Sequence, residues 1–131
     1  FICISIFMIR IILKGRIPSK KNSKVWTWRI LISSKEYRKW ELDMIKQMQE
    51  QSIQKSKLDK ELYITYKIWF PDNRKADLSN KVESINDLMV DYWLLADDNH
   101  NIIKSMNITS MWVDKENPRA EIQIYLFNSM E

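Results

Sequence analysis

Acidic side chains gather in one stretch of the sequence, between residues 74 and 98. Asp77 precedes a segment with helical periodicity. When successive residues are placed roughly 100° apart, the face opposite the apolar residues carries Asn80, Glu83, Asp87 and Asp91. Carboxylates on one face without interleaved Lys or Arg repel one another, and a hard divalent cation relieves that repulsion by binding their oxygens. The spacing therefore predicts a Mg²⁺ site, with Mn²⁺ as an alternative ion, and leaves open which of Asp87 and Asp91 faces it.

A second acidic pair, Asp97-Asp98, follows the apolar link 93–96, and we expect it to fold back towards the start of the helix. Adjacent residues of an extended segment point in opposite directions, so only one of the two is expected to face the metal. Asp77 also stands at the N-cap position, where a carboxylate accepts hydrogen bonds from backbone N–H groups of the first turn. A purely structural cap is the alternative explanation for Asp77.

The two halves of the chain differ in charge. Residues 1–60 carry 14 Lys and Arg against 5 Asp and Glu, a net charge of +9, whereas residues 61–131 carry 7 against 12, a net charge of −5. A basic half beside an acidic cluster is typical of a protein that binds a polyanion and uses a metal to neutralise the carboxylates. Ordinary charge scatter is the alternative. The residues expected to contact the phosphates of that polyanion are Lys20, Lys21, Asn22, Lys24, Arg74 and Lys75.

Composition excludes several classes of protein. The single cysteine, Cys3, excludes a disulfide framework, and a lone His100 beside it argues against a Cys/His zinc site. One glycine in 131 residues excludes a glycine-rich phosphate loop. The apolar start of the chain, interrupted by Arg10, is shorter than the roughly 20 residues that span a bilayer. We therefore expect a cytoplasmic protein with no membrane partner and no small-molecule cofactor.

The length fits a single domain. The first methionine is Met8, so we expect translation to start there. Residues 1–8 are then a non-native N-terminal extension or the start of the first strand, and residues 9–131 form one domain.

The elements that must position the acidic residues follow the order β-β-α-β-α-β-β. Strands are expected at 9–14, 24–32, 61–70, 101–113 and 119–127, and helices at 33–50 and 77–92. The side chains expected to face the core are, in the first helix, Tyr37, Trp40, Met44 and Met48, and in the second helix Leu78, Val82, Ile85, Met89 and Tyr92. Asn117-Pro118 suggests a hairpin between the last two strands. This pattern predicts an α+β domain, a small mixed β-sheet with two main helices on one side.

Arg74–Asn80, followed by Asp87-Leu88 and Asp97-Asp98, resembles the RusA-type Holliday junction resolvases of phages and prophages. That family has an Arg/Lys-x-Asp-x-Asp-Asn run, a Lys three residues after the Asn, an Asp followed by a Leu, and an Asp-Asp pair. The segment Gly15–Ser23 is similar to the family's G-x-P-x-x-K-x-N opening, so the resemblance covers residues 9–127. It implies a RusA-like fold and a homodimer. It also implies a Mg²⁺-dependent endodeoxyribonuclease that resolves four-way DNA junctions by paired phosphodiester hydrolysis.

Two positions depart from the family pattern. Ser79 stands where the family has its second Asp, and Glu83 stands where it has Lys. The resemblance implies that the catalytic carboxylates and metal ligands are Asp77, Glu83, Asp87 and Asp98, with Ser79, Asn80, Asp97 and Lys104 supporting the site. In this interpretation Glu83 restores the number of ligands, and Lys75, Lys81 or Lys104 replaces the missing lysine.

Two other functions remain open at this stage. One is a catalytically impaired relative that binds branched DNA without cutting it, because Ser79 has removed a carboxylate. The other is a small phage regulatory protein whose carboxylate face binds a protein partner.

Overall fold

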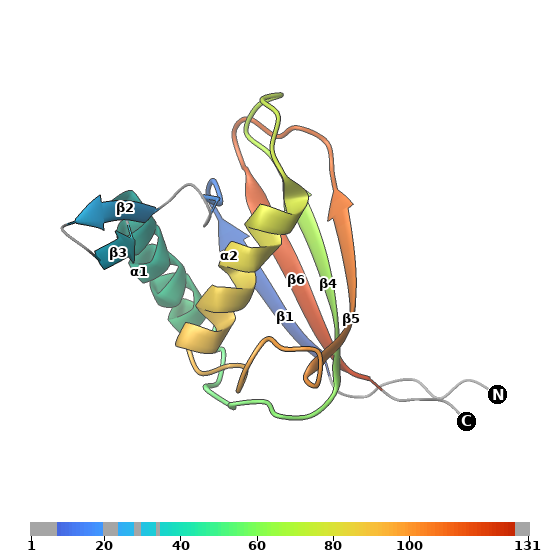
Figure 1. Ribbon diagram of the computed structural model, residues 1–131. Helices are drawn as coiled ribbons and strands as arrows, with labels where there is room; N and C mark the ends of the chain where they lie inside the picture. The colour runs from blue at the N-terminus through green and yellow to red at the C-terminus, as the bar shows by residue number, and fades with distance from the viewer. Residues whose placement is uncertain (1–7, 20–23, 28–29, 34, 128–131) are drawn as a thin grey trace.

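The computed structural model describes residues 8–19, 24–27, 30–33 and 35–127 of the chain. A four-stranded sheet has the order β1 (Met8–Lys14), β6 (Arg119–Leu126), β4 (Leu62–Trp69) and β5 (Ile103–Ser110) (Figure 1). β6 runs antiparallel to both β1 and β4, whereas β4 and β5 are parallel. The sheet is therefore mixed, as the sequence predicted, and its two edges are β1 and β5.

The two helices, α1 (Lys35–Glu50) and α2 (Leu78–Asp91), share one hydrophobic core with the sheet (Figure 1). Alternate strand residues face them, which is why Ile11, Ile64 and Ile122 are fully buried. Both predicted apolar helix faces are confirmed, with Met44 and Met48 of α1 and Ile85 and Met89 of α2 at most 2% exposed. The predicted α+β class is confirmed. Across the described ranges no helix is long and apolar enough to cross a membrane.

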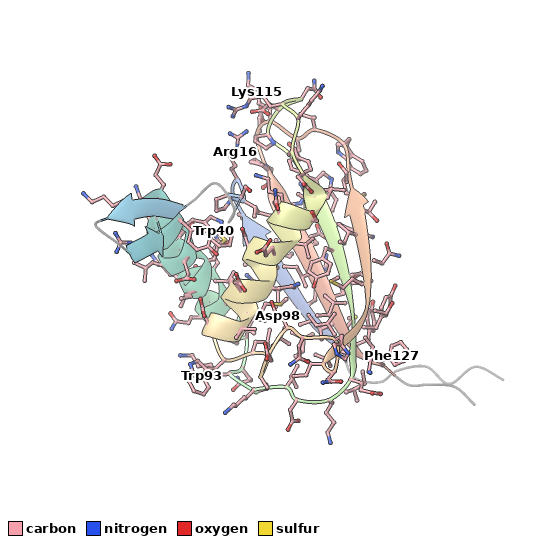
Figure 2. The ribbon with its side chains drawn as sticks, viewed as in Figure 1. Arg16, Trp40, Trp93, Asp98, Lys115 and Phe127 are labelled. Atoms are coloured by element: carbon pink, nitrogen blue, oxygen red, sulfur yellow. The ribbon has the colours of Figure 1, made fainter. Side chains whose placement is uncertain are left out.

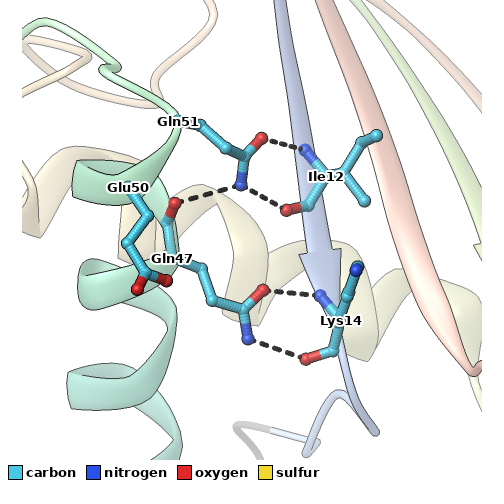
Figure 3. Close-up of a pocket in the computed structure, with 5 residues that line it drawn as sticks. All are labelled: Ile12, Lys14, Gln47, Glu50 and Gln51. Atoms are coloured by element: carbon cyan, nitrogen blue, oxygen red, sulfur yellow. Dashed lines mark hydrogen bonds between the residues drawn. The ribbon is translucent and has the colours of Figure 1, made fainter.

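Two glutamine side chains attach α1 to the edge strand β1 (Figure 3). Gln51 accepts a hydrogen bond from the Ile12 N–H at 2.9 Å and donates one to the Ile12 carbonyl at 2.6 Å. Gln47 makes the same pair of bonds with Lys14, at 2.7 and 3.0 Å. Side chains four residues apart on a helix lie on the same side, as do residues two apart on a strand. Gln47 and Gln51 can therefore reach Lys14 and Ile12 in the same way. Each carboxamide bonds to the strand edge as a peptide group of a neighbouring strand would. They thereby satisfy backbone groups that an edge strand otherwise leaves exposed.

The segment predicted as a single strand over 24–32 is two strands instead. β2 (Lys24–Thr27) and β3 (Ile30–Ser33) pair antiparallel as a separate two-stranded sheet, with Thr27 opposite Ile30. The prediction was wrong because side chains alternate with a period of two both in one long strand and in two short paired strands, so the pattern does not distinguish them.

The predicted hairpin at Asn117-Pro118 is also wrong, because β4 lies between β5 and β6. After β5 ends, the chain continues beside the end of β4, where the Met111 N–H donates to the Ile68 carbonyl and the Asp114 N–H to the Phe70 carbonyl, both at 2.8 Å. It then crosses over the end of β4 and enters β6. The connection is therefore a crossover between strands that are not neighbours.

Candidate active site

The second helix and the two parallel strands form a β4-α2-β5 unit, and one end of this unit gathers the functional groups. The loop 70–77 leaves β4 at its carboxyl end and leads into α2, so the N-terminus of α2 lies near the carboxyl ends of β4 and β5 (Figure 1). Ligands of sheets with parallel strands bind beyond the carboxyl ends of those strands. The N-terminus of a helix attracts anions through its exposed N–H groups and its dipole.

Asp77 is the N-cap of α2, as the sequence predicted. Its backbone is extended, with φ −92° and ψ 114°, and its Oδ1 accepts hydrogen bonds from the Ser79 N–H at 3.0 Å and the Ser79 hydroxyl at 2.6 Å. The residue is exposed. Ser79, at the position where the resemblance implied a second carboxylate, therefore donates to the first one.

Asp72 bridges two arginines at this end of the helix. Its Oδ2 lies 3.0 Å from Arg16 Nη2 and 3.1 Å from Arg74 Nε, and its Oδ1 accepts from the Arg74 N–H at 3.1 Å. These bonds from Arg74, together with the positive charges of both arginines, hold the pKa of the Asp72 carboxyl below its usual value. Asp72 therefore stays ionised and keeps the two guanidinium groups side by side.

A third cation, Lys81, belongs to the first turns of α2. Its Nζ donates to the Ile17 carbonyl at 2.6 Å, while the Ser84 hydroxyl donates to the Pro18 carbonyl at 2.8 Å. Partial burial lowers the pKa of Lys81, and the charges of Arg16 and Arg74 lower it further. The segment that leads into the predicted basic loop is thus fastened to α2, and three cations surround the start of the helix.

An open pocket of about 440 Å³ lies at the same end. Its lining includes Asp72 and Arg74 from the β4–α2 loop and Met111 and Trp112 from the segment after β5. The Trp112 side chain is 65% exposed, and its ring meets the Trp69 ring edge to face, with centroids 5.8 Å apart. Guanidinium groups beside an exposed aromatic ring suit a nucleic acid, because they offer contacts to both phosphates and bases.

Comparison with known proteins identifies the family of this chain. The family model described as endodeoxyribonuclease RusA matches residues 14–125, which is most of the chain. The chain belongs to the RusA family. Among curated proteins the comparison finds no match.

Membership of the RusA family fixes the reaction class. The protein is an endodeoxyribonuclease, an enzyme that hydrolyses phosphodiester bonds, and the family's substrates are branched DNA of the Holliday junction type. RusA-family nucleases generally depend on a divalent metal ion. The cations around the N-terminus of α2 are consistent with a phosphate-bearing substrate.

Two other predicted carboxylates of this RusA-family chain, Glu83 and Asp87, lie further along α2. Asp87 is ten residues after Asp77, which corresponds to about 15 Å along the helix axis. Asp98, labelled in Figure 2, lies within electrostatic range of Tyr66. The Tyr66 hydroxyl donates to Asn86 Oδ1 at 2.5 Å. Burial raises the pKa of the Tyr66 hydroxyl, and the charge of Asp98 raises it further. The loop with Asp98 therefore folds back beside Asn86 in the second half of α2, and not at its start as we expected.

The described residues contain no group of three or more His, Cys, Asp or Glu side chains placed to hold a metal ion. Mg²⁺–oxygen bonds are about 2 Å long, so one ion does not bridge groups as far apart as Asp77 and Asp87. A Mg²⁺ ion that takes one or two carboxylates and completes its shell with water and substrate phosphate fits the exposed Asp77. The four-carboxylate set of Asp77, Glu83, Asp87 and Asp98 stays a prediction.

The remaining predicted residues fall into three groups. Asp97 accepts hydrogen bonds from the Asp98 N–H at 2.7 Å and from Asn99 Nδ2 at 3.0 Å, which fixes the turn. Lys104, at the opposite end of β5 and about 20 Å from the end of that strand, lies 3.5 Å from Glu61 Oε2. Exposed Lys75 and half-buried Asn80 flank Asp77. Lys20, Lys21 and Asn22 lie outside the described residues, and Lys24 begins β2.

Sequence reasoning missed Arg16 and named Lys81 only as one of three substitutes for the missing lysine. Arg16 and its partner Asp72 are 56 residues apart in the sequence, and Lys81 and its partner Ile17 are 64 residues apart. The signal that was available is the position of Arg16 in the family-like opening, directly after the only glycine of the chain, Gly15, with φ +116°.

Proposed function

We propose that this RusA-family protein is a Mg²⁺-dependent, structure-specific endonuclease that acts in the cytoplasm as a homodimer and resolves four-way DNA junctions by paired hydrolysis. The observation that carries the proposal is the N-terminus of α2, where Asp77 caps the helix and the paired Arg16 and Arg74 lie within electrostatic range of Lys81. Paired nicks need two centres, one from each subunit.

The side chains at this end have distinct roles in the proposed reaction. Arg74 and Arg16, held by Asp72, bind the scissile phosphate and orient it against the start of α2. Asp77 would hold the Mg²⁺ ion, which would supply Lewis acidity and a water of lowered pKa. Lys81 takes the place of the missing family lysine, because a lysine of lowered pKa protonates a leaving 3′-oxygen more readily.

The test is a nicking assay on an immobile synthetic four-way junction, with and without Mg²⁺ and with linear duplex as competitor. The proposal expects symmetric, Mg²⁺-dependent nicks in opposed strands. It expects Asp77→Asn to abolish them while junction binding stays or tightens, because removal of a negative charge favours phosphate approach. Asp98→Asn, Glu83→Gln and Asp87→Asn test the other predicted carboxylates, and Asp59→Asn, at an exposed site outside α2, is the matched control. Cutting that is unchanged in Asp77→Asn contradicts the proposal.

A catalytically impaired, junction-binding protein is the second candidate. Two observations favour it: Ser79 donates to Asp77 in place of a second carboxylate, and no three-carboxylate group is found among the described residues. The double variant Ser79→Asp/Glu83→Lys restores the family pattern at both departures. If the wild-type protein binds junctions without cutting and the double variant cuts, the second candidate is correct.

A further inference from the structure

The C-terminus of α2 carries a tryptophan where the backbone favours glycine. Trp93 follows the C-cap Tyr92, its N–H donates to the Val90 carbonyl at 3.0 Å, and the Leu94 N–H donates to the Met89 carbonyl at 3.0 Å. These two bonds define a Schellman motif, whose residue after the C-cap adopts the left-handed conformation and is usually glycine. Trp93 has φ +72°. This conformation is strained for a residue other than glycine.

The chain offers a matched position at the end of α1. The Ser52 N–H donates to the Gln49 carbonyl and the Ile53 N–H to the Met48 carbonyl, both at 3.0 Å, and Ser52 has φ +59°. The two helices therefore end in the same motif with a non-glycine residue at the same place. Serine there adds only a small polar group, whereas tryptophan adds the largest side chain.

Trp93 is also exposed, and its backbone is held firmly. The side chain is 57% exposed to solvent. Its carbonyl accepts from the Lys57 N–H at 2.7 Å, and the next pair, Leu58 N–H to the Leu94 carbonyl at 2.8 Å, continues this parallel contact. An exposed ring on a fixed backbone is pre-organised for a ligand, because little entropy is lost when the ligand binds.

One lysine lies at this ring and a second lies at the ring of its neighbour in sequence. Lys57 Nζ lies 5.0 Å from the centroid of the Trp93 ring, and Lys55 Nζ lies 5.3 Å from the centroid of the Tyr92 ring. Aromatic rings that stack on bases, combined with ammonium groups that contact the backbone, are the features of proteins that bind unpaired nucleic acid. Strain at an exposed side chain supports a role in function, since folding alone does not require it.

We infer that Trp93, with Lys57 and Lys55, is a second DNA contact that stacks on an unpaired base of the substrate. The inference rests on the proposed DNA substrate but not on the identity of the catalytic carboxylates. Trp93 is 16 residues beyond Asp77, about 24 Å along the helix axis, which corresponds to about seven base pairs. Figure 2 shows Arg16 in the upper part of the molecule and Trp93 in its lower part. A branched substrate that spans α2 reaches both, with a phosphate at one end and an unpaired base at the other.

The test compares Trp93→Gly with Ser52→Gly, which make the same backbone change in the same motif. Glycine adopts the left-handed conformation without strain, so the unfolding temperature of both variants is expected to equal or exceed that of the wild-type protein. Binding is measured by fluorescence anisotropy with a labelled four-way junction and a labelled oligothymidylate. Trp93→Gly is expected to weaken both affinities about 5- to 100-fold, the usual effect of removing a stacked aromatic ring. Ser52→Gly is expected to leave them unchanged, and Trp93→Phe is expected to retain most of the affinity.

The inference is overturned if Trp93→Gly binds both DNAs as the wild-type protein does. Should Trp93→Gly unfold early, Trp93→Asn answers the same question, because asparagine also tolerates the left-handed conformation. A wild-type protein that binds and cuts junctions, beside an equally active Trp93→Gly, refutes only this inference. A wild-type protein without DNA affinity refutes the proposed function as well.

Discussion

Gln51→Glu tests the attachment of α1 to the sheet without changing the size of the side chain. In the wild-type protein Gln51 Nε2 donates to the Ile12 carbonyl at 2.6 Å. The same Nε2 also donates to the Gln47 carbonyl at 3.1 Å. The variant places a carboxylate oxygen there at neutral pH, so both hydrogen bonds are lost and acceptors face each other. An intramolecular hydrogen bond contributes about 1 kcal/mol, and an unpaired group beside it adds to the loss. We expect the free energy of unfolding to fall by about 1–3 kcal/mol, and the melting temperature to fall by about 3–10 °C.

The sign of the pH dependence follows from the same contact. A protonated carboxyl donates to the Ile12 carbonyl as the amide does, so the folded state favours the protonated form and raises the pKa of the introduced carboxyl. Stability from that bond is fully present below the unfolded pKa, about 4.3 for Glu, and is lost as the pH rises through the folded pKa. The difference in the free energy of unfolding between variant and wild type is therefore smaller at acid pH and larger at neutral pH.

The measurement is urea-induced unfolding of both proteins between pH 4 and pH 8. Gln49→Glu makes the same chemical change on the same helix at an exposed position, and controls for the added charge. A Gln51→Glu variant as stable as Gln49→Glu at pH 7 refutes the reasoning. So does a difference that does not change with pH, because the loss then does not come from the missing proton.

Three further outcomes follow from the site and the core. Arg74→Ala is expected to reduce the slope of log affinity for junction DNA against log salt by about 1, whereas Lys104→Ala, at the opposite end of β5, leaves the slope unchanged; filter binding at several salt concentrations checks both. Lys81→Gln is expected to lower the rate of junction cleavage about 100-fold with little change in junction affinity. A single-turnover assay measures this rate, and an unchanged rate contradicts the role of Lys81. Burial, followed by the charges of Glu41 and Asp91, raises the pKa of Tyr37 to about 12. The stability from its protonated form is complete below pH 10 and is lost as the pH rises towards 12, so Tyr37→Phe should resist alkaline unfolding better than the wild type, and equal alkaline midpoints exclude this cause.

Local periodicity predicted the helices and most strands correctly, because it depends on residues close in sequence. The apolar spacing in α2 identified its buried face, and Ile85 and Met89 are fully buried. The order of the strands depends on distant residues instead. Ile64 of β4 pairs with both Ile124 of β6 and Met106 of β5, and nothing in the turn residues of the last connection indicates that β4 lies between the two strands.

The same limit explains the outcome for the predicted site. Residues that share a helix face share an angle about the helix axis, but the pattern says nothing of their separation along it. Asn80 and Asp87 lie within about 20° of each other around the axis, yet they are about 10 Å apart along α2, and Asp87 is about 15 Å from Asp77. The N-cap role of Asp77 was predictable, since capping depends on neighbours in sequence. The Arg16–Asp72 pair was not, since 56 residues separate its members.

The N-terminus of α2 carries more positive than negative charge. Arg16, Arg74 and Lys81 contribute three positive charges, against which Asp72 and Asp77 contribute two negative ones. The helix dipole adds partial positive charge at this end, and the Ser79 hydroxyl donates to Asp77 where a second carboxylate would add an acceptor. This end therefore attracts phosphate more strongly than it attracts a bare cation. In the proposed reaction, phosphate oxygens of the DNA would supply part of the metal's oxygen shell beside Asp77, so substrate binding and metal binding would reinforce each other.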